Sequence, residues 1–180
     1  GVDDYVVVQD DPILRVQNDN FTISTWVRNT AVNDNDIFIQ KRTTDGRYTY
    51  QLGLNYSLNK YSMWIDDDVN AVSIYSETEV MLNQWVHIAG VKNGDVYSIY
   101  INGVHENSAT HYQVEVINDG PIIIGTIESN FSNPEGGQAP LWLDGSLDNI
   151  QIWNRALTKE EINQSIYEQD FGVDDESLVG

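Results

Sequence analysis

Two alternating runs joined by a tight turn place the strongest constraint on the fold. The segment WVHIAGVKNGDVYSIYING (85–103) alternates apolar and polar residues on both sides of Asn93-Gly94. A strand places alternate residues on opposite faces, and Asn-Gly is the strongest short signal for a type I′ hairpin turn. Pairing outward from this turn predicts one shared buried face, made of Val86, Ile88, Gly90, Tyr97, Ile99 and Ile101. In this register Tyr97 lies across from Gly90, so its ring covers the gap that the glycine leaves.

The same period-two pattern recurs along most of the chain up to residue 155. It predicts further strands at 5–9, 21–28, 37–41, 48–55, 61–66, 72–76 and 121–125. Such alternation is typical of antiparallel strands with one buried face and one solvated face. The expected core residues of the middle strands are Leu52, Leu54, Met63, Ile65, Val72 and Ile74.

The pattern changes near the C-terminal end. Thr158 and Glu161 form a capping box, and Leu157 with Ile162 fits the hydrophobic staple around it. A short helix is therefore expected to begin at Thr158 and to end at Phe171-Gly172. Many short strands and one terminal helix predict an all-β fold, an antiparallel two-sheet sandwich that forms a single domain over residues 1–180.

The composition excludes several classes of function. The chain has 28 acidic and 9 basic residues and a net charge of −19. Nucleic acids and anionic membranes select basic patches, so neither is an expected partner. No run of about 18 apolar residues is present, so no membrane insertion is expected. Cysteine is absent, which excludes disulfides, zinc–thiolate sites and thiol catalysis.

Several segments, taken in order, resemble a known family. GVDDYVVV, FTISTWVR, WVHIAGV, IYINGV, IIIG and DGSLDNIQIWNRALTKEEI resemble the laminin-G-like, concanavalin-A-like jelly-roll domains related to pentraxins. The resemblance spans nearly the whole chain, and LDNIQIWNRALTKEEI is its most specific part. It implies a jelly roll in an extracellular or cell-surface setting. EINQSIYEQ and DESLVG resemble the seam between tandem copies, which implies one module of a larger multidomain protein.

Asp148 is a candidate metal ligand. It shares strand parity with Ile150 and Ile152, so its carboxylate faces the core or lies where the core ends. A carboxylate that faces a core must be neutral, hydrogen-bonded or bound to a cation. The first strand, after Asp3 and Asp4, is the expected antiparallel neighbour of the last strand. Ca²⁺ prefers such hard oxygen ligands, and the resemblance implies a structural calcium at Asp148. The alternative is that Asp148 caps backbone amides near the helix.

The polar face of the middle strands is the candidate ligand site. The alternates of the core residues are Gln51, Asn55, Ser62, Trp64, Asp66, Ser73 and Tyr75. An aromatic ring packs on the face of a sugar while amides and carboxylates bind its hydroxyls. We expect Trp64 and Tyr75 to form the platform, Gln51 and Asp66 to orient the sugar, and the acidic charge to favour a neutral glycan. The alternative is that a loop covers Trp64 and Tyr75.

A second candidate surface is the long loop that carries Phe131 and Trp142. Aromatic residues beside glycines in a long loop are often recognition elements. The alternative is that both residues anchor the loop locally.

The sequence lacks a catalytic pattern. Glucanases of this superfamily carry E-x-D-x-E or E-x-D-x-x-E on one strand, and the nearest approach here, Glu77-Thr78-Glu79, has no aspartate. We therefore expect no enzyme activity and a calcium-stabilised, carbohydrate-binding, lectin-like module. One alternative is an adhesion or spacer module that contacts protein. Another is an accessory domain of a polysaccharide-degrading enzyme.

Overall fold

The computed structural model describes residues 4–17, 19–32, 36–44, 48–67, 69–113, 115, 118–127, 141–168 and 175–180. In chain order its elements are β1 (Val6–Val8), η1 (Pro12–Leu14), β2 (Phe21–Asn29), β3 (Ile37–Arg42), β4 (Tyr48–Asn55), β5 (Lys60–Asp66), β6 (Ala71–Glu79), β7 (Val86–Asn93), β8 (Val96–Ile101), β9 (Val104–Thr110), β10 (Ile122–Ile124), β11 (Thr126–Ile127), β12 (Leu141–Trp142), β13 (Gly145–Trp153) and α1 (Lys159–Tyr167).

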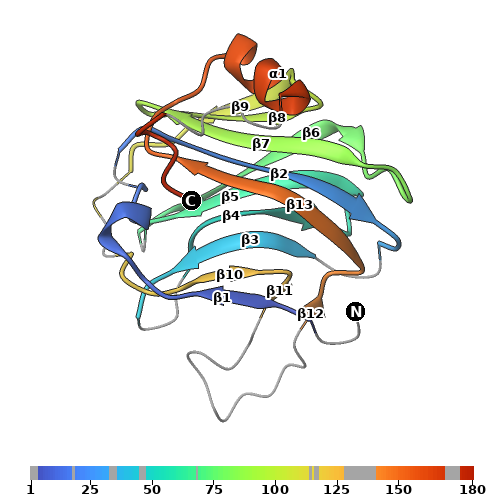
Figure 1. Ribbon diagram of the computed structural model, residues 1–180, viewed down its shortest axis with the longest axis horizontal. Helices are drawn as coiled ribbons and strands as arrows, with labels where there is room; N and C mark the ends of the chain where they lie inside the picture. Colours follow the sequence, from blue (N-terminus) through green and yellow to red (C-terminus); the bar gives the residue numbers. More distant parts are fainter. Residues whose placement is uncertain are drawn as a thin grey trace.

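The strands form a sandwich of two antiparallel sheets (Figure 1). The six-stranded sheet has the order β1-β10-β3-β4-β5-β6, and the five-stranded sheet has the order β13-β2-β7-β8-β9. A small separate pair joins β11 to β12. The predicted all-β jelly-roll sandwich is confirmed.

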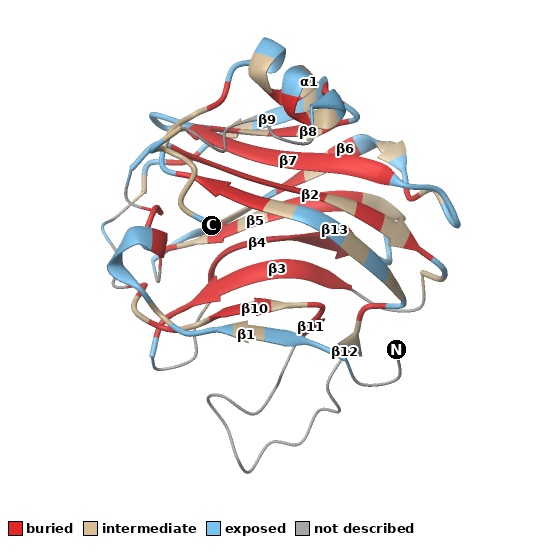
Figure 2. Ribbon diagram, viewed as in Figure 1, coloured by how far each residue is buried: buried red, intermediate tan, exposed pale blue. Residues whose placement is uncertain are grey.

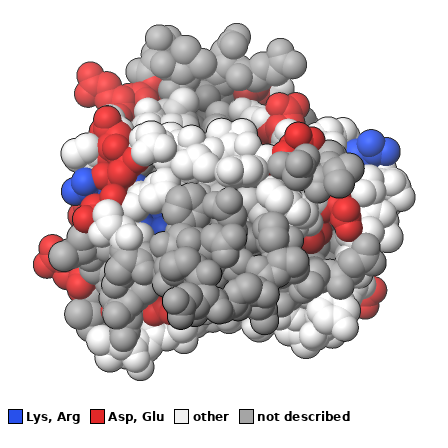
Figure 3. All heavy atoms as spheres, turned by 90° about the horizontal axis from the view of Figure 1, so that it is seen from below, with Lys and Arg blue, Asp and Glu red and all other residues white. Residues whose placement is uncertain are grey.

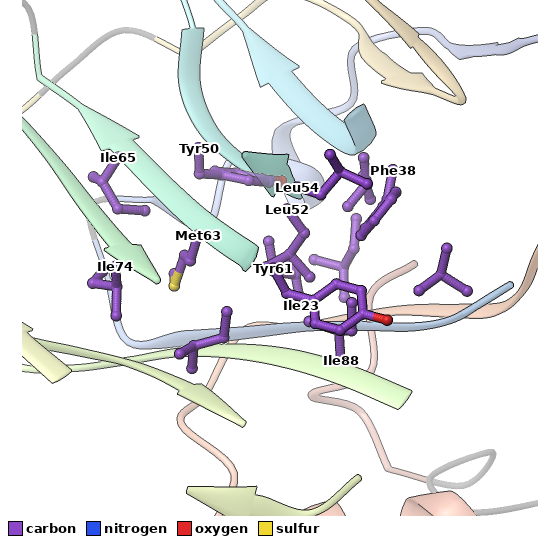
Figure 4. Close-up of a cluster of buried hydrophobic side chains, with 14 of the residues drawn as sticks. Ile23, Phe38, Tyr50, Leu52, Leu54, Tyr61, Met63, Ile65, Ile74 and Ile88 are labelled. Carbon is purple, nitrogen blue, oxygen red and sulfur yellow. The ribbon is translucent and has the colours of Figure 1, made fainter. Parts of the chain in front are cut away.

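The core lies between the two sheets and consists mainly of aliphatic and aromatic side chains (Figure 4). All six core residues that the alternation predicted lie in it, five of them buried and Val72 partly buried. Each fully buried aliphatic side chain stabilises the fold by about 1.5–3 kcal/mol relative to an exposed one. Figure 2 shows that β3, β4 and β7 are buried along most of their length, whereas β1 and β9 are largely exposed.

The hairpin of β7 and β8 has the predicted faces but a different register. Gly90 pairs with Ile99, whereas the sequence predicted Tyr97. The loop residues are Gly94-Asp95, and Gly94 has a φ of 59°. Glycine at the first central position is typical of a type II′ turn, not of the predicted type I′ turn. Because the partner shifts by two residues, every side chain keeps its face.

The opposite sheet fills the space beside Gly90. A Cβ atom at this position would lie 2.8 Å from Met63 Sδ and 3.0 Å from Leu52 Cδ2. The absent side chain therefore lets the two sheets approach each other, and Tyr97 does not cover a gap there.

The edges of the sandwich differ from the sequence expectation at one point. The first strand, β1, pairs with β10, and the last strand, β13, pairs with β2. The prediction that the first and last strands are direct neighbours is therefore wrong, because they belong to different sheets.

The helix begins as predicted and ends earlier. Thr158 is the N-cap, and its capping box with Glu161 is complete. Leu157 and Ile162 pack with Trp153 in a second cluster on the outer face of the five-stranded sheet. Figure 1 shows α1 lying on this side of the molecule. The helix ends at Tyr167. No helix in the described ranges is long and apolar enough to cross a membrane.

The C-terminal residues 175–180 lie along β13. The Val179 amide donates to the Ile152 carbonyl oxygen at 2.8 Å, and Arg155 joins Asp175 to Glu161 through two ion pairs of 2.9 and 2.8 Å. The tail, β13 and α1 therefore form one packed unit.

Candidate binding sites

A pocket of about 240 Å³ opens on the outer face of the six-stranded sheet. Aromatic, amide, hydroxyl and aliphatic side chains line it: Ile37, Tyr48, Gln51, Leu54, Asn55, Ser62, Trp64, Ser73 and Tyr75. None of these described lining residues is charged, although the chain carries a net charge of −19. Figure 3 shows acidic side chains distributed over several parts of one face of the molecule. The lining is therefore an uncharged region on a strongly acidic protein.

The register of β4, β5 and β6 brings the predicted platform residues together. Gln51 pairs with Trp64, Trp64 pairs with Ser73, and Ser62 pairs with Tyr75. Paired residues point to the same face of a sheet, so these side chains are neighbours. Asp66 pairs with Ala71 at the end of the strands and is not part of the lining.

Three lining residues lie outside the predicted polar face: Ile37, Tyr48 and the predicted core residue Leu54. Bulges account for the first two. Lys41 pairs with Tyr50 and Arg42 pairs with Tyr48, so β4 has one extra residue between these two pairs, which is a bulge. Because of this bulge Tyr48 faces outward while Tyr50 stays in the core. A second bulge in β3 turns Ile37 toward the pocket in the same way. A bulge adds one residue and re-aims the side chains beyond it. Strict alternation counted back from the core residue Leu52 places Tyr48 on the core face, and the bulge makes this assignment wrong.

Tyr48 holds the orientation of Trp64. The two rings lie 5.4 Å apart at an interplanar angle of 39°, and the guanidinium carbon of Arg42 lies 4.7 Å from the Tyr48 ring. Cation–π and aromatic contacts of this kind contribute about 0.5–1.5 kcal/mol each. Trp64 and Tyr75 both remain partly exposed. The pocket therefore presents partly exposed aromatic rings, and contacts with Tyr48 and Arg42 support the ring of Trp64.

The second candidate surface borders a different pocket. Trp142 lies in β12 with its ring 5.7 Å from that of Tyr5. Both rings line a pocket of about 240 Å³ between β1 and the start of β13, together with Asp4. Phe131 lies outside the described residues. Trp142 and Trp64 do not share a pocket.

Asp148 points away from the core because a bulge interrupts β13 between Asp148 and Gln151. Leu147 packs against the core, whereas Asp148 is exposed on the outer face and pairs with Trp26. Its Oδ1 accepts the backbone N–H of Asn149 at 2.8 Å, and Asn149 has a φ of 49°. The predicted shared parity with Ile150 and Ile152 is therefore wrong.

The described residues do not assemble the predicted calcium ligands around one point. Asp4 lines the pocket beside Trp142, whereas Asp148 lines a third pocket under α1. Asp3 lies outside the described residues. Within the part of the chain that is described, no three His, Cys, Asp or Glu side chains gather as a metal site. Calcium at Asp148 stays a prediction.

Comparison with known proteins identifies the family. A family model for the concanavalin A-like lectin/glucanases superfamily matches residues 1–163. No curated protein matches the chain. A heptameric SAP-like pentraxin from Limulus polyphemus has a similar structure, with a TM-score of 0.66 and 18% identity, over 88% of this chain and 73% of the pentraxin.

Two other solved structures are longer than this chain. A protein from Bacteroides ovatus described as carbohydrate-binding has a TM-score of 0.67 and 15% identity, over 97% of this chain and 47% of that protein. The binding domain of Paraclostridial Mosquitocidal Protein 1 has a TM-score of 0.63 and 20% identity, over 89% and 40%. The chain thus spans less than half of either, and at these identities the likeness shows the fold alone.

Proposed function

We propose, from the premise that this chain belongs to the concanavalin A-like lectin/glucanase superfamily, that it is a noncatalytic carbohydrate-binding module. Its site is the pocket around Trp64, and its ligand is a neutral glycan. Its setting is extracellular or on a cell surface, as one module of a longer protein.

The chemistry of the pocket lining carries this proposal. Trp64, Tyr48 and Tyr75 supply partly exposed rings, and Gln51 and Asn55 supply amide donors and acceptors. A pyranose ring has one apolar face and a rim of hydroxyl groups, so it needs this combination. Because the described lining holds no charge, it offers no cation to a sugar carboxylate or sulfate.

The carboxylates of β6 support a noncatalytic role. Glycoside hydrolysis needs an acid and a base or nucleophile at a set separation across the sugar. Glu77 and Glu79 lie on β6 outside the lining of the Trp64 pocket, and the segment Glu77-Thr78-Glu79 lacks the aspartate that the glucanase motif carries two residues after its first glutamate. The Bacteroides ovatus neighbour is described as carbohydrate-binding, which agrees with a binding module.

The test is a glycan array followed by calorimetry on the best neutral glycan. Trp64→Ala removes the central ring and is expected to weaken binding by about 1–3 kcal/mol, as loss of an aromatic anchor does. The fold should survive, because Trp64 lies outside the core cluster. Trp85→Ala is the matched control, since Trp85 is exposed just before β7, a strand of the other sheet, and is not part of the lining.

Two results would contradict this placement. Unchanged affinity in a folded Trp64→Ala protein would remove the pocket from the proposal. Loss of affinity in Trp142→Ala alone would move the site to the pocket beside Tyr5.

Protein contact is the second candidate function. One neighbour is the receptor-binding domain of botulinum neurotoxin type G, with a TM-score of 0.60 and 15% identity. An adhesion module would bind a soluble protein panel and leave the glycan array blank. An accessory role beside a catalytic domain would appear in the domains that adjoin this module.

A further inference from the structure

We propose that the pocket under the C-terminal end of α1 binds an organic cation, an ammonium or guanidinium group. The pocket has a volume of about 360 Å³ and lies on the outer face of the five-stranded sheet, so it is separate from the Trp64 pocket. Its lining residues are Trp26, Asp148, Asn149, Ser165, Ile166 and Glu168.

The floor of the pocket places an aromatic ring beside a carboxylate. Trp26 and Asp148 are direct partners across β2 and β13, so both side chains leave the same face of the sheet. The bulge after Asp148 is what turns this carboxylate outward. Trp26 is half-buried, and the ring of His87 lies 5.5 Å from it at 72°, edge to face. The indole is therefore held by an edge-to-face contact with His87 and lines the pocket.

The electrostatic potential of the pocket favours a cation. Asp148 and Glu168 are both exposed at its rim, and no described lining residue is basic. The C-terminal end of a helix adds partial negative charge through its free carbonyl groups. The last turn of α1 has no basic residue to offset that charge. Arg28, two positions along β2 on the same face, donates to the Asn83 carbonyl oxygen and is not part of the lining.

Two buried hydrogen-bonding groups lie on the sheet next to the floor residues, although neither is in the lining itself. Gln151 follows the bulge on the same face, is 7% exposed, and its Oε1 has no hydrogen-bond partner among the described residues. Nδ1 of His87, which is 1% exposed, also has none in that part of the chain. Burial lowers the pKa of His87 to about 4, so the imidazole is neutral and adds no opposing charge. An amide oxygen is an acceptor only, and organic cations bring several N–H donors.

The indole distinguishes an organic cation from a metal ion. Ca²⁺ binds through six to eight oxygen atoms and gains little from an aromatic face. Ammonium and guanidinium groups gain about 0.5–2 kcal/mol over an indole ring. Trp26 and Ile166 supply the apolar surface that the carbon stem of such a ligand needs.

The experiment is a titration with ethylguanidinium chloride at constant ionic strength, followed by NMR of the five tryptophan indole N–H signals. Trp26→Phe identifies the Trp26 signal by its loss. We expect that signal alone to move and to saturate. Asp148→Asn should weaken the affinity up to about five-fold, the usual effect of one partly exposed charge. Glu79→Gln is the matched control, because it removes one exposed carboxylate remote from the pocket.

Two source classes supply such groups, amino sugars and basic peptides. Glucosamine and a lysine-containing dipeptide amide form the two further arms, with N-acetylglucosamine as the uncharged partner of the first. Saturation by either cation supports the proposal and names its source. Shifts that stay linear with concentration, that are equal in Asp148→Asn and the wild type, or that N-acetylglucosamine reproduces would overturn it.

Discussion

His87 is buried in the middle of the five-stranded sheet, and burial lowers its pKa from 6.5 to about 4. The folded protein therefore keeps His87 neutral while the unfolded chain takes up a proton as the pH falls below 6.5. Because the unfolded state binds more protons in this window, the free energy of unfolding falls between pH 6.5 and 4. The full loss amounts to about 3 kcal/mol.

Urea unfolding at pH 7, 5.5 and 4.5 measures this effect. His87→Gln has no titrating group at the position and should lose less stability over the same range. The lowered pKa values of Asp10, hydrogen-bonded to Arg15, and of Asp175, hydrogen-bonded to Ser177, act mainly below 3.8. Burial raises the pKa of Glu161, but the Thr158 backbone N–H and Arg155 together lower it by more, and this lowered pKa acts from about 4.5 downward in both proteins, so the difference between them isolates His87. Equal pH dependence in the two proteins would show that His87 is not the responsible group.

Single residues also mark where prediction from the sequence stops. The alternation correctly assigned Gln51, Trp64 and Tyr75 to one face, because β4, β5 and β6 pair without a slip there. It failed at Tyr48 and Asp148, because each adjoins a bulge that adds one residue and reverses the parity. A bulge has no reliable sequence signal, since it depends on how both strands are paired.

At the scale of elements, Glu106 joins the two sheets at the edge where β6 meets β9. Its Oε2 accepts the backbone N–H groups of Glu77 at 2.8 Å and Thr78 at 2.9 Å, and its Oε1 accepts the Thr78 hydroxyl. Hydrogen bonds to a charged group contribute about 1.5–3 kcal/mol each, and loss of the carboxylate leaves donors without a charged acceptor. Glu106→Gln should therefore lower the free energy of unfolding by about 1–3 kcal/mol.

The measurement is urea unfolding of the variant and the wild type. An equal slope of the transition in both proteins checks that both unfold in two states. Glu79→Gln removes an exposed carboxylate from β6, the strand that Glu106 contacts, and surface changes of this kind cost about 0.5 kcal/mol or less. If both variants share one midpoint, the contact between β6 and β9 does not depend on the charge of Glu106.

The helix and most of the strands were predictable from the sequence, but β9, β11 and β12 were not expected, and the pairing between strands was less predictable. The helix start follows from the capping box at Thr158, a purely local signal. The hairpin at Gly94-Asp95 lies two residues from the predicted register, because the turn type depends on φ angles that Asn93-Gly94 does not determine alone. The partner of β1 is set by contacts distant in sequence, and no local pattern shows it.

For the whole molecule, a net charge of −19 makes every cation stabilising to some degree. Repulsion among like charges destabilises the compact state, and dissolved salt screens it with a Debye length of about 10 Å at 0.1 M. A rise of the melting temperature in CaCl₂ is therefore no evidence of a site unless NaCl and MgCl₂ at equal ionic strength produce a smaller rise.

If Asp148 holds a calcium ion, the rise in calcium should exceed the salt effect. Binding to the folded state alone stabilises it by about 2.7 kcal/mol at a calcium concentration 100 times the Kd, or about 5–10 °C for a chain of this length. Asp148→Ala should abolish only that excess, because the exposed carboxylate contributes little in the absence of calcium. Thermal unfolding of both proteins in CaCl₂, MgCl₂, NaCl and chelator checks this. Equal shifts in all three salts, or an excess that survives in Asp148→Ala, would show that Asp148 holds no calcium, and the effect would then belong to the charge of the molecule as a whole.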